Sequence, residues 1–319
     1  MSFPEKFACV FPGQGSQSVG MMDGYTDFPI VRETFAEASD ILGEDFWAMV
    51  RDGPADTLNL TINTQPLMLI AGVAVHRAWN TLGDVKPVFM AGHSLGEYTA
   101  LVASGALAFS DALPLVRFRA EVMQEAVPEG AGAMAAILGL DDELVRVVCN
   151  EVTGSSHGEL LEPANFNSPG QIVIAGHKNA VLRGMELAKL RGAKRAVLLT
   201  VSIPSHCSLM SPAAERLRER LEEVVLDVPE IPLLHNADVQ QHEDPETIKE
   251  VLIQQLFSPV QWTEIIHSFA NAGITCVVEC GPGKILSGLN KRISANLQSL
   301  ALSDSAAIRN ADSILRRSE

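Results

Sequence analysis

The sequence has no apolar run long enough to cross a membrane as a helix. None of its apolar stretches approaches the roughly 20 residues that such a helix needs. The first residues, Met1 to Lys6, do not combine a basic segment with a following apolar one, so we expect no secretory signal peptide. These two absences predict a cytoplasmic protein that does not use a membrane as a partner.

Cysteine is scarce, and its spacing matches no known framework. An odd count of five, scattered along the chain, predicts neither a set of disulfides nor a zinc site, and we expect no bound metal. A reducing compartment is the simplest setting for such thiols. The five residues are Cys9, Cys149, Cys207, Cys276 and Cys280.

Basic residues are outnumbered by acidic ones. The chain has 24 Lys and Arg against 39 Asp and Glu, a net charge of −15. So acidic a protein is a poor partner for nucleic acid or an anionic membrane, and we expect neither. Four basic residues within seven form the main local exception: Lys189, Arg191, Lys194 and Arg195. Either they are a solvated helix end or they dock an anionic partner.

Two glycine-rich loops lack the residues that nucleotide binding requires. The loop after the first predicted strand, at 6–11, contains Gly13 and Gly15, but Ser18 stands where a dinucleotide fingerprint needs its third glycine. A second loop ending in Lys284 lacks the upstream glycine of a phosphate-binding loop. We therefore expect no nucleotide cofactor.

The most informative motif is Gly92-His93-Ser94-Leu95-Gly96, a G-x-S-x-G pentapeptide. An apolar run, 88–91, precedes it and a helix-prone run, 97–103, follows it. Strand, sharp turn and helix are the context of a nucleophile elbow, which exposes the serine hydroxyl. The following helix directs free N–H groups toward an oxyanion. Ser94 is therefore a candidate nucleophile, with the N–H groups of Leu95 and Gln14 as candidate oxyanion donors.

A serine needs a base to accept its proton. His206 is the best candidate among the eight histidines, because it lies where a predicted inserted segment rejoins the main domain. His93 is expected to point away from Ser94. No carboxylate stands out as a partner for the base, so we expect a neutral acceptor such as a backbone carbonyl. The carboxylates between serine and base, Asp111, Asp141 and Asp142, suit helix N-termini instead.

Arg117 and Arg119 lie on one predicted helix, about 200° apart. Only one of them can face inward, where it would select a substrate with a free carboxylate. Periodicity leaves open which one it is.

The order of predicted elements indicates an α/β fold. Strands separated by helices predict a parallel sheet covered on both faces. Among the covering helices we expect one over 64–82, capped by Thr64, and one over 110–126, capped by Ser110. Residues 128–202 break this pattern with the order β-α-β-β-α-β, the ferredoxin-like arrangement. We therefore predict a core of residues 1–127 and 203–319 with an insert at 128–202.

Together these motifs resemble the malonyl-CoA:acyl carrier protein transacylases of bacterial type II fatty acid synthesis. Seven motifs occur in matching order over nearly the whole chain, which is far more specific than any one of them. They are residues 11–17, 92–98, 123–128, 165–171, 204–207, 254–255 together with 259–262, and 281–283.

The resemblance implies a role for each candidate residue. Ser94 would become acylated, His206 would be the general base, and the main-chain carbonyl of Gln255 would orient that base. Gln14 and Leu95 would form the oxyanion hole. Arg119 would bind the malonyl carboxylate, and we assign Asn167 to substrate binding.

The resemblance also implies fold and partners. It implies an α/β-hydrolase-like core with an inserted ferredoxin-like subdomain. The substrates would be malonyl-CoA and acyl carrier protein, with no cofactor beyond the coenzyme A thioester itself, and we expect a monomer. Carrier proteins of this pathway are acidic, so candidates for docking them are the four basic residues above with Lys284, Lys291 and Arg292.

Two other functions are compatible with the residues alone. A serine hydrolase would use the same elbow with water as acceptor. A protein that only binds an acyl carrier would need no nucleophile.

Overall fold

The computed structural model describes residues 6–83, 85–155, 158–201 and 203–316. Residues 1–5, which carry most of the segment behind the signal-peptide prediction, and residue 202, at the predicted end of the insert, lie outside the described part. Within the described part, no helix combines the length and the apolar character needed to span a membrane.

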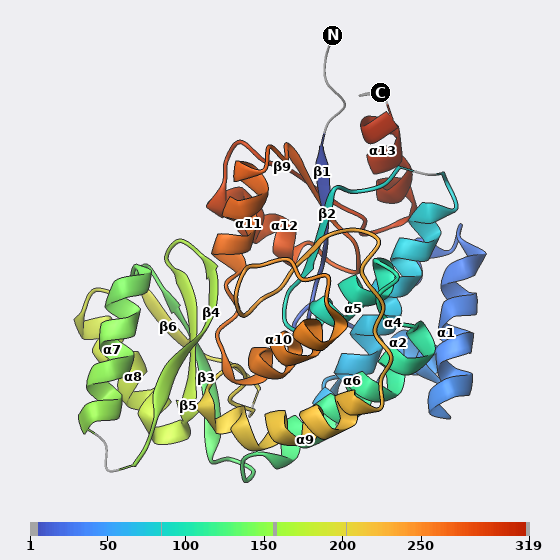
Figure 1. Cartoon of the computed structure of the whole chain (residues 1–319). Helices are drawn as coiled ribbons and strands as arrows, with labels where there is room; N and C mark the ends of the chain where they lie inside the picture. The colour runs from blue at the N-terminus through green and yellow to red at the C-terminus, as the bar shows by residue number, and fades with distance from the viewer. Residues whose placement is uncertain (1–5, 84, 156–157, 202, 317–319) are drawn as a thin grey trace.

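A five-stranded parallel sheet forms the centre of the larger part of the molecule (Figure 1). Its strand order is β7-β2-β1-β8-β9, and every neighbouring pair is parallel. The predicted parallel sheet is confirmed. The strands are β1 (Phe7–Phe11), β2 (Phe89–Gly92), β7 (Leu233–Leu234), β8 (Cys276–Glu279) and β9 (Gln298–Ala301).

Both faces of this sheet are covered. Alternate residues of a strand point to opposite faces, so one strand contributes side chains to the core on each side. In β1, Phe7, Cys9 and Phe11 join the larger core, formed with the buried helix α4 (Thr61–Asn80) and its neighbours. Ala8 and Val10 join a second core on the other face. There the covering helices are α11 (Trp262–Asn271) and α12 (Ile285–Ile293).

A four-stranded antiparallel sheet lies beside the first (Figure 1). Its strands follow the order β4-β5-β3-β6, and each neighbouring pair is antiparallel. One face packs against two helices through a separate apolar core. The opposite face meets Cys207 through Met134 and Val173. These elements are β3 (Gly132–Leu138), α7 (Asp142–Ser155), β4 (Leu161–Ser168), β5 (Gln171–His177), α8 (Lys178–Leu190) and β6 (Arg195–Leu198).

The segment before α11 connects the two sheets. The N–H of Phe166 in β4 donates to the carbonyl of Val260 at 2.9 Å, and the N–H of Val260 donates to the carbonyl of Ala164 at 2.9 Å. This ladder fixes the end of β4 beside the parallel sheet. The remaining elements are η1 (Asp23–Tyr25), α1 (Pro29–Leu42), α2 (Phe46–Asp52), α3 (Ala55–Leu58), α5 (Gly96–Ala103), α6 (Phe109–Glu125), η2 (Ser208–Met210), α9 (Ser211–Glu222), α10 (Pro245–Phe257) and α13 (Ser305–Arg316).

The two predicted helix caps are wrong. Helix α4 begins three residues earlier than expected, and the Thr64 hydroxyl donates to the carbonyl of Leu58 at 2.7 Å instead of accepting an N–H. Helix α6 begins at Phe109 after Ala108, which leaves Ser110 exposed in the first turn. A hydroxyl side chain is found both at the N-cap and within the first turn of a helix. Composition alone therefore misplaces the helix start by a residue or more.

We predict that Ser110→Ala leaves the melting temperature within about 1 °C of the wild-type value. The matched change Asp244→Ala removes a cap whose carboxylate accepts the N–H of Thr247, and it should lower the melting temperature by about 1–3 °C. Thermal unfolding followed by circular dichroism compares the two. An equal loss from both changes would contradict this assignment of the helix starts.

Candidate active site

Ser94 lies in a sharp turn between β2 and α5. Its φ of 52° is in the left-handed region, which is unfavourable for a serine and typical of strained functional turns. The turn closes tightly because its flanks are glycines. A Cβ at Gly92 would lie 1.8 Å from the carbonyl carbon of Gly96, and a Cβ at Gly96 would lie 2.1 Å from the oxygen of Phe11. The pentapeptide therefore forms the turn that its spacing predicts.

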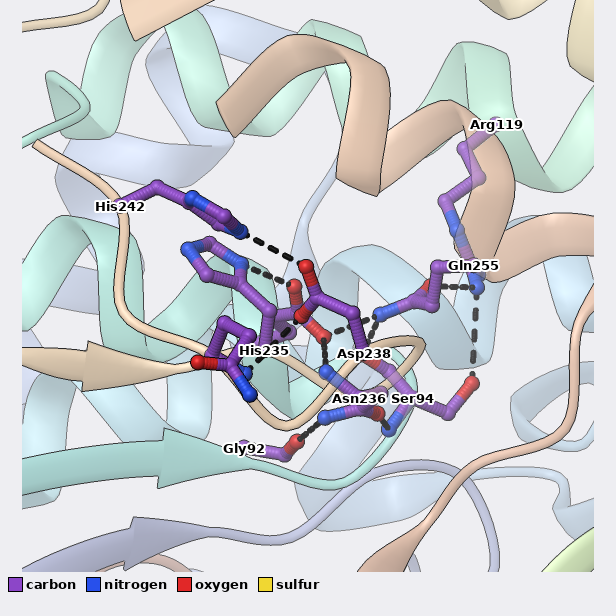
Figure 2. A network of polar contacts seen from close by, with 10 residues as sticks. Gly92, Ser94, Arg119, His235, Asn236, Asp238, His242 and Gln255 are labelled. Carbon is purple, nitrogen blue, oxygen red and sulfur yellow. Dashed lines mark hydrogen bonds and ion pairs between the residues drawn. The ribbon is translucent and has the colours of Figure 1, made fainter. Parts of the chain in front are cut away.

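The side chain of Asn236 stabilises this turn with two hydrogen bonds to its backbone. Its Oδ1 accepts the N–H of Ser94 at 2.7 Å, and its Nδ2 donates to the carbonyl of Gly92 at 2.6 Å (Figure 2). Asn236 is fully buried and follows β7, the strand beside β2. The carboxyl ends of neighbouring parallel strands thus support the strained nucleophile together.

His206 stands beside the Ser94 hydroxyl. Its Nε2 is 2.7 Å from Ser94 Oγ, and its Nδ1 is 2.7 Å from the main-chain carbonyl of Gln255. A carbonyl can only accept, so Nδ1 carries the ring proton and Nε2 presents a lone pair to the serine. The arrangement can transfer a proton from Ser94 to His206.

Burial keeps this histidine neutral. Desolvation, followed by the nearby positive charge of Arg119, lowers the pKa of His206 to about 3. At neutral pH the imidazole is therefore unprotonated and able to act as a base.

Arg119 is the inward arginine of α6. Its Nη1 donates to Gln65 Oε1 at 2.6 Å, and its Nη2 donates to Gln255 Oε1 at 3.0 Å and lies 3.4 Å from Ser94 Oγ. Arg117 turns the other way, toward an ion pair with Glu44 at 2.9 Å. The structure thus selects between the two arginines that periodicity left open.

The charge of Arg119 has no direct counter-ion among the residues that the structure describes. Its hydrogen bonds go to neutral oxygens, and no described carboxylate lies within 4 Å of it as an ion pair. Burial lowers the pKa of Arg119, but a guanidinium stays protonated at neutral pH. A buried cation beside a nucleophile favours a ligand that brings its own carboxylate.

The loop after β1 lies against the elbow. A Cβ at Gly13 would lie 2.4 Å from the oxygen of His93 and 3.6 Å from the nitrogen of Leu95, so only glycine allows this approach. Gln14 follows directly; its side chain is exposed and accepts from the Thr61 hydroxyl at 3.3 Å. Leu95 is buried and immediately precedes α5, and the N–H groups of Gly96 and Glu97 after it donate to the carbonyls of His93 and Ser94.

Asn167 lies at the end of β4, on the other side of His93. Its Oδ1 is 2.8 Å from His93 Nε2, and burial lowers the pKa of His93. His93 contacts Asn167, whereas the sequence predicted only that its side chain points away from Ser94. The contact places Asn167 near the elbow without bringing it to Ser94 itself.

Three buried polar residues of the site were not predicted from the sequence. Gln65 and Asn236 hold Arg119 and Ser94, and Glu97 contacts Gln255 at 2.8 Å. Each carried a signal in the sequence. Gln65 stands just before the apolar part of a helix, Asn236 follows a strand end, and Glu97 directly follows the G-x-S-x-G motif.

The described hydrogen bonds and ion pairs of the basic residues proposed for docking do not involve this network. Lys189 and Arg191 end α8, where Arg191 pairs with Glu151 at 2.6 Å. Arg292, in the last turn of α12, donates to Gln171. The choice between a solvated helix end and a docking surface therefore stays a prediction.

Metal and thiol chemistry find no support in the described part of the chain. No described group of three or more His, Cys, Asp or Glu side chains is arranged to hold a metal ion. All five cysteines are buried and free. Burial raises the pKa of Cys149 and of Cys207 to about 12, which makes both thiols unreactive.

Comparison with known proteins gives consistent matches over nearly the whole chain. Residues 8–300 match the model of the acyl transferase domain. The chain is 51% identical over 304 residues to the malonyl CoA-acyl carrier protein transacylase of Escherichia coli K12, covering 95% of this chain and 97% of that protein. It is 46% identical to the transacylase of the same name from Bacillus subtilis, covering 95% of each.

Solved structures agree. The malonyl CoA-acyl carrier protein transacylase of Coxiella burnetii superposes with a TM-score of 0.96 at 46% identity, over 99% of both chains. A malonyl-transacylase solved in complex with its type II PKS acyl-carrier protein superposes with a TM-score of 0.94 at 49% identity, over 96% of this chain and 98% of that one.

We predict that proton transfer from Ser94 to His206 does not follow the titration of an ordinary histidine. The lowered pKa of His206 should keep kcat/KM for malonyl-pantetheine within about threefold between pH 7.5 and 5.5. An imidazole with the usual pKa of about 6.5 would lose roughly tenfold over that range. The pantetheine thioester is used because it has no phosphate that titrates there. A half-maximal rate near pH 6.5 would contradict the prediction.

Proposed function

The chain belongs to the acyl transferase domain family, and we propose that it carries a malonyl group on Ser94 between two thiols. Its activity is the transfer of malonyl from malonyl-CoA to acyl carrier protein in fatty acid synthesis. One observation carries the proposed mechanism. A buried arginine lies 3.4 Å from a serine hydroxyl whose base is neutral and 2.7 Å away.

The first half of the reaction forms the malonyl-serine. Ser94 Oγ attacks the thioester carbonyl while His206 Nε2 takes the hydroxyl proton. The N–H groups of Gln14 and Leu95 stabilise the oxyanion of the tetrahedral intermediate. The C–S bond then breaks, and His206 returns the proton to the departing coenzyme A thiolate.

The second half reverses these steps with a new thiol. The phosphopantetheine thiol of acyl carrier protein gives its proton to His206, and its sulfur attacks the malonyl-serine carbonyl. Collapse of the intermediate forms the new thioester, breaks the bond to Ser94 Oγ and returns the proton to that oxygen. The Gln255 carbonyl keeps the imidazole in the required tautomer throughout.

Arg119 selects the acyl group in this scheme. The malonyl carboxylate forms a bidentate pair with a guanidinium that otherwise has only neutral partners. Asn167 would assist on the His93 side of the site. The thioester is already activated, so the scheme requires no further cofactor.

The fold assignment rests on the two sheets. We assign residues 1–127 and 203–319 to an α/β-hydrolase-like core, supported by the parallel sheet with the elbow at the end of β2. We assign 128–202 to a ferredoxin-like insert. The strand order β4-β5-β3-β6, all antiparallel with α7 and α8 on one face, supports this. A cytoplasmic location and a monomeric state remain predictions of the sequence.

The alternatives explain less of the site. A hydrolase gains nothing from Arg119, because an ester or thioester without a carboxylate leaves this buried cation unpaired. A protein that only binds a carrier does not need a strained serine with a base at hydrogen-bond distance.

The serine intermediate is tested by intact mass. Incubation with malonyl-CoA and no acceptor should add one malonyl group, and peptide mapping should place it on Ser94. Ser94→Ala should abolish the added mass. Addition of acyl carrier protein should then discharge the wild-type adduct faster than water does. An unmodified wild-type mass, or discharge at equal rates with and without the carrier, would contradict the transfer mechanism.

The binding of the malonyl carboxylate by Arg119, here called the carboxylate clamp, is tested by Arg119→Ala. Arg117→Ala is the matched control on the same helix. Loss of a charged, buried hydrogen-bonding partner should lower kcat/KM for malonyl-CoA by about 100-fold or more, with a smaller loss or a gain for acetyl-CoA. Arg117→Ala should change neither by more than about threefold. Equal losses for both substrates in Arg119→Ala would reject the clamp.

A further inference from the structure

A carboxylate lies behind the active site and takes no part in the transfer scheme. Glu97, in the first turn of α5, has no exposed surface. Its Oε1 accepts from His235 Nδ1 at 2.7 Å, and its Oε2 accepts from the Asn236 N–H at 3.0 Å and from Gln255 Nε2 at 2.8 Å. These three donors compensate the cost of burying the carboxylate.

Among these donors, the Gln255 amide reaches the active site. Its Nε2 donates both to Glu97 and to the main-chain carbonyl of Ser94, at 3.0 Å. Its Oε1 is therefore the end that faces Arg119 Nη2. If the Gln255 amide were flipped, its NH2 group would face the N–H groups of Arg119, and its oxygen would face the carboxylate of Glu97. Both contacts would be repulsive. Glu97 and the Ser94 carbonyl together thus determine which end of the amide Arg119 meets, and Glu97 is the charged acceptor of the two.

We propose that Glu97 is a positioning residue for acyl-group selection. Acting through the Gln255 amide, it keeps the Arg119 guanidinium directed at Ser94 Oγ and so sets the preference for acyl groups that carry a carboxylate. The inference rests on the role of Arg119 under the proposed function. It assigns no contact between Glu97 and the substrate.

The Gln255 amide separates the positive charge of Arg119 from the negative charge of Glu97, which leaves the guanidinium available to a substrate. A direct ion pair with Glu97 would satisfy Arg119 and compete with the substrate carboxylate. With one amide between them, the negative charge still stabilises the buried cation, while the guanidinium keeps donor capacity for a ligand. Its Nε has no hydrogen-bond partner among the described residues.

Two substitutions separate orientation from loss of the side chain. In Glu97→Gln, the new amide oxygen at the Oε2 position still accepts from Asn236 and Gln255. The new amide N–H at the Oε1 position donates to His235 Nδ1 once the imidazole proton moves to Nε2. That nitrogen has no partner in the described part of the chain, so the tautomer change breaks no hydrogen bond. Glu97→Ala removes all three contacts.

Glu279 provides a matched control. It is also fully buried, and its carboxylate accepts the backbone N–H groups of Leu286 at 3.0 Å and Ser287 at 2.7 Å, at the start of α12. These contacts are structural and do not involve Gln255. Glu279→Ala should lower stability without changing the choice of acyl group.

The experiment measures single-turnover acylation of Ser94 by malonyl-CoA and by acetyl-CoA, followed by intact mass, in the full-length enzyme. Glu97→Ala should lower the malonyl-to-acetyl rate ratio by about tenfold or more, mainly through the malonyl rate. Glu97→Gln should keep the ratio within about threefold of wild type, and Glu279→Ala should keep it unchanged. In an Arg119→Ala background, Glu97→Ala should lower the ratio no further, because the two residues act on one interaction.

Glu97→Asp is measured alongside, since it keeps a carboxylate but withdraws it from Gln255 by one methylene. It should also lower the ratio, and it replaces Glu97→Ala if that variant does not fold. The inference is overturned if the folded Ala or Asp variant keeps the wild-type ratio, if both rates fall equally, or if Glu97→Gln loses as much as Glu97→Ala. A ratio that still falls in the Arg119→Ala background would also overturn it. Failure of wild type to form malonyl-Ser94 would instead defeat the proposed function itself.

Discussion

The site depends on one residue, Gln255, which contacts both the base and the cation. Its main-chain carbonyl accepts from His206 at 2.7 Å, and its side-chain oxygen accepts from Arg119 at 3.0 Å. Because both contacts come from one position of α10, the imidazole and the guanidinium have a fixed relation to each other. The elbow adds Ser94 to this pair through the Gln255 amide and Asn236.

The neutral character of these partners has a chemical consequence. A carboxylate beside His206 would raise its pKa, whereas a carbonyl orients the ring while burial keeps it unprotonated. A carboxylate beside Arg119 would occupy the guanidinium that the substrate needs. The nearest negative charge in the hydrogen-bond network, Glu97, lies one amide away. An isolated buried cation costs several kcal/mol, and this arrangement lets the substrate carboxylate supply the missing partner.

The sequence was most informative where chemistry and local geometry are encoded together. The spacing of Gly92, Ser94 and Gly96 predicted the turn, because only glycine fits the contacts at its flanks. The absence of a suitable carboxylate predicted a neutral acceptor for the base, and a carbonyl lies there. Periodicity separated Arg117 from Arg119 but could not choose between them, since the choice depends on Glu44 in a distant segment. Gln65, Glu97 and Asn236 were missed for the same reason: their partners are 54, 158 and 142 residues away.

The central claim is that the positive charge of Arg119 is paired by the carboxylate of the acyl group rather than by a residue of the protein. The most direct measurement is a crystal structure of the enzyme loaded with malonyl-CoA before any acceptor is added. The account predicts a malonyl ester on Ser94 with both carboxylate oxygens at hydrogen-bond distance from the Arg119 guanidinium. The carbonyl oxygen of the ester should lie at the N–H groups of Gln14 and Leu95. A malonyl carboxylate that points to solvent or to another cation, with Arg119 still bound only by Gln65 and Gln255, would contradict it.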